Sequence, residues 1–148
     1  MATKRLGTAM VLLLIAAAAS LPGCGSHDAF SRVIVEGSVQ YNGQPVPKGA
    51  IWFVPQASMG IEAPTGFALI RDGKYQTERL KAPIAGSYSI KITGFDTVPP
   101  TAAEQAEWGD REFPGHPLFP EYVVTETISA ETTTLDFEVP VSKKSKRR

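Results

Sequence analysis

The sequence has few of the residues that most enzymes and metal centres depend on. It contains one cysteine and two histidines, His27 and His116, in 148 residues. A lone cysteine cannot form an internal disulfide, and one histidine in the body of the chain gives little support to a metal site or a Ser-His-Asp triad. We find no catalytic constellation, and we expect no enzymatic activity, no cofactor and no metal.

The sequence also lacks an apolar run long enough to span a bilayer. Its longest such run, residues 9–19 (AMVLLLIAAAA), follows Lys4 and Arg5. A short apolar segment after basic residues is typical of an export signal, so we predict a signal peptide over residues 1–23.

The end of this signal resembles the lipobox of bacterial lipoproteins, with Leu21 at position −3, Pro22 at −2, Gly23 at −1 and then Cys24. Pro22 departs from the small or aliphatic residue usual at −2. The resemblance implies that Cys24 carries the lipid and that the protein is anchored in a membrane of the cell envelope, inner or outer, which the sequence leaves open. The alternative is cleavage by the ordinary signal peptidase, with Cys24 left free.

Charge is segregated along the chain although the formal net charge is zero. Residues 141–148 form a basic tail that we expect to be disordered, and all 15 acidic residues lie between the signal and this tail. Anionic lipid headgroups are available partners for the tail of an exported protein, nucleic acid is not, and a purely solubilising role is the alternative. Residues 24–31 are short and polar, which suits a tether.

The body of the chain, residues 32–140, alternates between strand patterns and turn signals. Residues 33–55 read as a first hairpin with a turn at Asn42-Gly43, and Trp52 is expected in the core. Asp72-Gly73 predicts a second hairpin. Three further strands are expected at residues 87–93, 123–130 and 134–139. About seven strands with no long helix between them predict an all-β, seven-stranded antiparallel β-sandwich.

One irregular insertion, residues 94–117, interrupts this spacing. Thr101 followed by Glu104 matches a capping box, so a short helix is expected over residues 102–108, with Trp108 docking it on the sandwich. Long loops often carry recognition residues. The candidate partner-binding residues are Trp108, Glu104, Glu107, Asp110 and Glu112. A solvated acidic loop is the competing interpretation, and we favour it over a Ca²⁺ site.

Several motifs in this order resemble the carboxypeptidase-regulatory-like, transthyretin-like (prealbumin-like) domain. They include residues 35–39 (VEGSV), 42–46 (NGQPV), 72–75 (DGKY), 83–92 (PIAGSYSIKI) and 120–122 (PEY). The resemblance covers residues 33–139, is strongest to small bacterial lipoproteins with one such domain, and implies a structural or binding role without an activity of its own.

The function expected from sequence is therefore a lipid-anchored, non-enzymatic binding or structural module that meets an envelope protein or glycan. A carbohydrate-binding or adhesion domain is the alternative, and Trp52, Trp108 and Phe119 are its candidate aromatic platform. An undetected hydrolase is third. The oligomeric state is left open.

Overall fold

The computed structural model describes residues 30–59 and 63–141. The predicted signal peptide, the lipobox with Cys24 and nearly all of the predicted tether and basic tail lie outside the described residues, so those predictions stay predictions. None of the described helices is long and apolar enough to cross a membrane.

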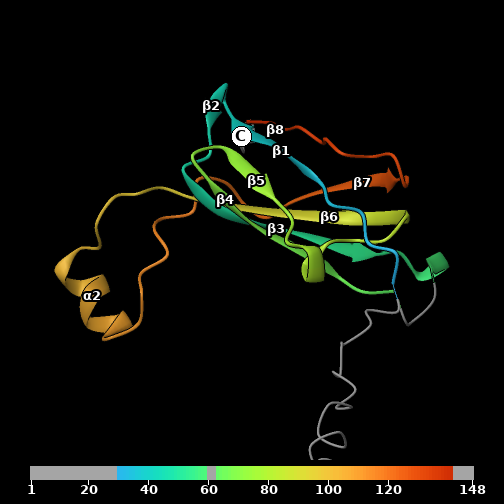
Figure 1. Cartoon of the computed structure of the whole chain (residues 1–148). Helices are drawn as coiled ribbons and strands as arrows, with labels where there is room; N and C mark the ends of the chain where they lie inside the picture. Colours follow the sequence, from blue (N-terminus) through green and yellow to red (C-terminus); the bar gives the residue numbers. More distant parts are fainter. Residues whose placement is uncertain (1–29, 60–62, 142–148) are drawn as a thin grey trace, which may run out of the picture.

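Strands dominate the described part of the chain (Figure 1). They are β1 (Glu36–Tyr41), β2 (Gln44–Pro45), β3 (Lys48–Pro55), β4 (Gly66–Arg71), β5 (Lys74–Gln76), β6 (Gly86–Phe95), β7 (Tyr122–Ile128) and β8 (Phe137–Val139). The helical elements are η2 (Ala57–Met59), η3 (Arg79–Lys81) and α2 (Ala102–Trp108).

The strands form one sheet with the order β2-β1-β5-β4-β3-β6-β7, which curls into a half-barrel. β8 also pairs with β1, and this pairing is parallel, whereas the other strand pairs are antiparallel. The predicted all-β fold is confirmed. Because the strands form one curved sheet, the core lies inside its curve.

Alternation within the strands supplies this core. In β6, Tyr88, Ile90 and Ile92 are buried, and in β1 Val39 is buried. Phe137 of β8 packs against Tyr75 of β5, at 6.2 Å between ring centroids. Side chains from strands far apart in the sequence therefore meet inside the curve, as the period-2 pattern predicts.

The prediction of a single first hairpin over residues 33–55 is wrong. Asn42-Gly43 does make a tight turn, but it joins β1 only to the two-residue strand β2. The pairing ends after the hydrogen bond from the Val46 N–H to the Val39 carbonyl, because the Val39 N–H donates to Gly73 and the next residue, Pro47, has no N–H to donate. The chain then passes beyond β5 and β4 in the sheet order, and β3 pairs with β4 and β6. The second predicted hairpin, at Asp72-Gly73, is confirmed as β4–β5.

Candidate functional site

The insertion, residues 94–117, forms an arm whose helix α2 stands away from the sheet (Figure 1). At its base the two legs are paired, with an antiparallel bridge from Phe95 to Pro117 and a hydrogen bond from the Leu118 N–H to the Gly94 carbonyl at 2.9 Å. The predicted helix is confirmed, including its capping box. No residue of α2 is buried, so this helix adds no side chain to the core.

His116 ties the helix to the base of the arm. Its Nδ1 lies 3.2 Å from Asp96 Oδ1, and its Nε2 lies 3.1 Å from Glu104 Oε1. Both ring nitrogens thus face carboxylates, an arrangement that only the doubly protonated imidazolium satisfies with two donors. The hydrogen bond to Asp96 raises the pKa of His116 against an opposing effect of partial burial, and the charges of Asp96 and Glu104 act in the same direction as that bond.

The two carboxylates of this cluster are held in their ionised forms. The backbone N–H of His116 donates to Asp96 at 2.9 Å and is the main cause that lowers the pKa of Asp96. The backbone N–H and the hydroxyl of Thr101 both donate to Glu104, and they lower its pKa. Asp96, Glu104 and His116, called the latch below, therefore connect helix α2 to the base of the arm.

The structure distributes the sequence-predicted partner-binding residues over different roles. Glu104 belongs to the latch, and Glu112 forms an ion pair with Lys48 of β3 at 3.1 Å. The prediction that Trp108 docks on the sheet is wrong, because its ring packs edge-on against Phe113, another residue of the arm, at 5.8 Å. Glu107 and Asp110 are exposed.

The guanidinium carbon of Arg111 lies 5.0 Å from the centre of the Trp108 ring. The tip of the arm, residues 107–111, therefore carries an aromatic and a cationic side chain as well as the acidic Glu107 and Asp110. Among the described residues, no group of three or more histidine, cysteine or acidic side chains is arranged to hold a metal ion.

The expected aromatic platform is not assembled. Phe119 is buried and packs on Tyr41, at 5.1 Å, and Trp108 lies on the arm. Trp52 does not lie in the core as expected but on the outer face of β3, where its ring lies 5.7 Å from that of Phe67. Because residues 51–54 are all apolar, alternation alone could not show which parity faces inward.

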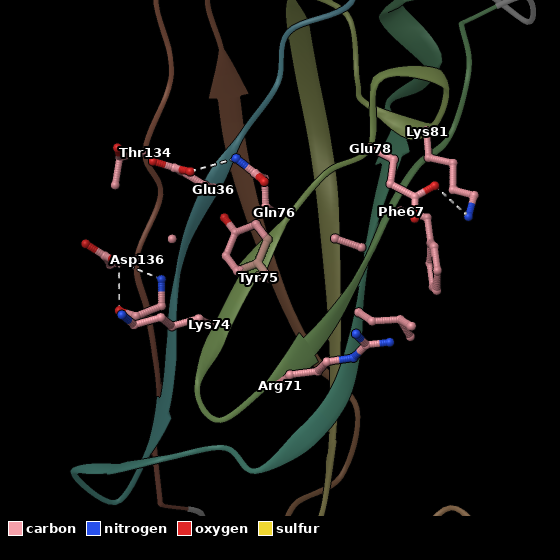
Figure 2. A pocket seen from close by; sticks show the side chains of 14 residues that line it. Glu36, Phe67, Arg71, Lys74, Tyr75, Gln76, Glu78, Lys81, Thr134 and Asp136 are labelled. Carbon is pink, nitrogen blue, oxygen red and sulfur yellow. Dashed lines mark hydrogen bonds and ion pairs between the residues drawn. The ribbon is translucent and has the colours of Figure 1, made fainter. Parts of the chain in front are cut away.

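A groove of about 680 Å³ opens on the outer face beside this aromatic pair, between β4 and the pair β5–β1 (Figure 2). One wall carries Phe67 and Arg71 of β4 together with Lys81 of η3, and the opposite wall carries Glu36 and Asp136 (Figure 2). Sequence analysis missed this groove, because its lining comes from three separate stretches of the chain, residues 36–38, 67–81 and 134–136.

Tyr75 lies between the two walls as a fixed structural group. Its hydroxyl donates to the Leu135 carbonyl at 2.8 Å, and burial raises the pKa of the phenol, with the Asp136 carboxylate adding to the shift. Asp136 itself accepts hydrogen bonds from the hydroxyl and the backbone N–H of Ser38, which lower its pKa. The described lining residues include no histidine or cysteine.

Comparisons with protein-family models, with curated proteins and with solved structures found no match to this chain.

Proposed function

We propose that the protein is an exported, lipid-anchored, non-enzymatic module that binds a partner at the cell envelope through the tip of its arm. The observation that carries the proposal is that α2 is fully formed and latched, yet buries no residue against the sheet. Binding residues are often carried by loops that protrude from a rigid scaffold, and the arm is such a loop. The proposed class is the carboxypeptidase-regulatory-like domain, supported by the motif order and by the all-β fold.

The anchor rests on the lipobox residues Leu21 to Cys24. One acyl chain binds membranes weakly and several hold firmly, so an acylated Cys24 would keep the module at the membrane. Cys24→Ser should release the protein into the soluble fraction or leave an uncleaved precursor. Mass spectrometry of the mature N-terminus decides the point, and a first residue other than an acylated Cys24 contradicts it.

The role of the arm is tested by replacing residues 97–115 with a short Gly/Ser linker. This deletion keeps the paired base of the arm and removes α2, so the thermal unfolding midpoint should change little while partner binding is lost. A photo-crosslinker placed at Asp110, on the tip, should capture the partner in cells. The matched control is the same group at Val123, an exposed residue on β7.

If the crosslinker at Val123 captures the partner and the one at Asp110 does not, recognition lies on the sheet, and the proposed role of the arm is refuted. Failure of the deletion variant to fold would make the arm structural.

A carbohydrate-binding role is the second candidate because Trp52 and Phe67 form an accessible aromatic pair. It predicts glycan-array binding that Trp52→Ala abolishes and Trp108→Ala leaves intact.

A further inference from the structure

The groove arises because two neighbouring strands separate. The ladder between β4 and β5 contains only the pairs Ile70–Tyr75 and Arg71–Lys74 next to their turn. After that, β5 follows β1. Thr77, which is 2% exposed, fixes this course, because its hydroxyl oxygen accepts a hydrogen bond from the Val35 N–H at 2.9 Å and its own N–H donates to the Val35 carbonyl. The edge of β4 is thereby left open.

The backbone groups on this open edge can be identified from the register. Asp72-Gly73 is a two-residue turn with φ values of 50° and 74°, so the flanking residues Arg71 and Lys74 exchange hydrogen bonds. Every second residue of β4 then points its N–H and C=O in the same direction, which selects Leu69 and Phe67. No other described residue pairs with these two on this side.

The side chains around the edge add apolar surface and positive charge. Leu69, which is 50% exposed, lines the groove with Phe67, and the Lys81 ammonium of η3 lies 5.9 Å from the centre of the Phe67 ring. Arg71 and Lys74 form no ion pair or side-chain hydrogen bond with the described residues, whereas Lys81 is paired with Glu78 at 3.1 Å. The cations that remain available therefore stand at the turn end of the open edge.

We propose that this groove binds an extended peptide segment, which adds as a strand to β4 at Phe67 and Leu69 and places an acidic side chain near Arg71. Open strand edges are templates for such addition, with main-chain hydrogen bonds supplying affinity and alternate side chains supplying specificity. Repeating N–H and C=O groups at strand spacing match a peptide backbone better than the hydroxyls of a sugar ring. The proposal is independent of the arm and of the lipid anchor.

Hydrogen exchange of the free protein gives the first test. The amides of Phe67 and Leu69 should exchange at least about tenfold faster than those of Ala68 and Ile70, which point toward β3. Equal protection of all four amides would mean that the edge is already paired, and it would overturn the proposal.

Binding is then tested with a capped hexapeptide of alternating valine and threonine that ends in glutamate. Binding should slow exchange at Phe67 and Leu69, and N-methylation of alternate peptide amides should abolish it, because the side chains stay while the strand donors are removed. Arg71→Glu should weaken binding about tenfold or more, and a lysine-ended peptide should recover it on this variant. Lys91→Glu, on the same outer face, is the matched control and should change little.

Three results of the binding experiment would also overturn the proposal. The first is equal binding of the N-methylated peptide, and the second is no binding of any of these peptides at millimolar concentration. The third is binding only of a uronic-acid oligosaccharide, used as the competing probe, with no change in exchange at Leu69. That result would assign the groove to an acidic glycan.

Discussion

Phe137 offers the most direct test of how the sheet closes. It lies in the three-residue strand β8, opposite Val39 of β1, and it is 7% exposed with its ring against Tyr75. If β8 completes the core, Phe137→Ala removes a buried aromatic ring and leaves a cavity, which costs about 3–5 kcal/mol. Domains of this size have a free energy of unfolding of about 5–15 kcal/mol, so the loss is a large share.

The expected change in thermal midpoint follows from this figure. One kcal/mol shifts the midpoint of a domain of about 100 residues by about 4–5 °C, so a fall of roughly 12–25 °C is expected. Differential scanning calorimetry measures it. Val123→Ala, on the outer face with 49% exposure, is the control and should change the free energy of unfolding by less than about 0.5 kcal/mol. If the two variants shift the midpoint equally, β8 is not part of the core.

Two further predictions concern polar contacts. Thr77→Val keeps the buried volume but leaves the Val35 N–H without its acceptor, so urea unfolding should show a loss of about 1–3 kcal/mol in the free energy of unfolding. An unchanged midpoint would contradict the role given to the Thr77–Val35 hydrogen bonds. The latch should depend on pH: the pKa of His116 is raised, so its contribution is complete below the ordinary histidine pKa of about 6.5 and is lost as pH rises through the raised native value. The pKa values of Asp96 and Glu104 are lowered, so their contribution is lost only as pH falls through those lowered values. Proteolysis within residues 97–115 should therefore accelerate above the native pKa of His116, measured by NMR titration, and an Asp96→Asn variant should shift that onset to lower pH; cleavage at a rate independent of pH would refute the latch.

Local chemistry in the sequence was enough to predict the turns and the helix. Asn42-Gly43 and Asp72-Gly73 both adopt positive φ, as tight turns of this type require. The helix over residues 102–108 has the predicted bounds because its capping box is a contact between neighbours, Thr101 and Glu104. The burial of alternate residues in β6 follows in the same way from period 2. These features depend on a few adjacent residues, so their signals survive in a one-dimensional pattern.

Which strands pair was decided only by the tertiary structure. The turn after β1 predicts a reversal, but it does not predict that β3 pairs with β4 and β6 or that β8 lies parallel to β1. The outward position of Trp52 also needed the structure, because apolar neighbours on both sides hide the parity of the strand.

The candidate sites divide in the same way. The sequence by itself determined an insertion with a capped helix and exposed carboxylates, because those features are local. The latch joins Asp96 and His116, which are 20 residues apart in the chain. In the groove, residues of β4 lie opposite Asp136. Neither site therefore leaves a spacing signal in the sequence. The paired base of the arm brings the latch residues together, and the curled sheet brings the walls of the groove together. Such contacts depend on how the whole chain folds.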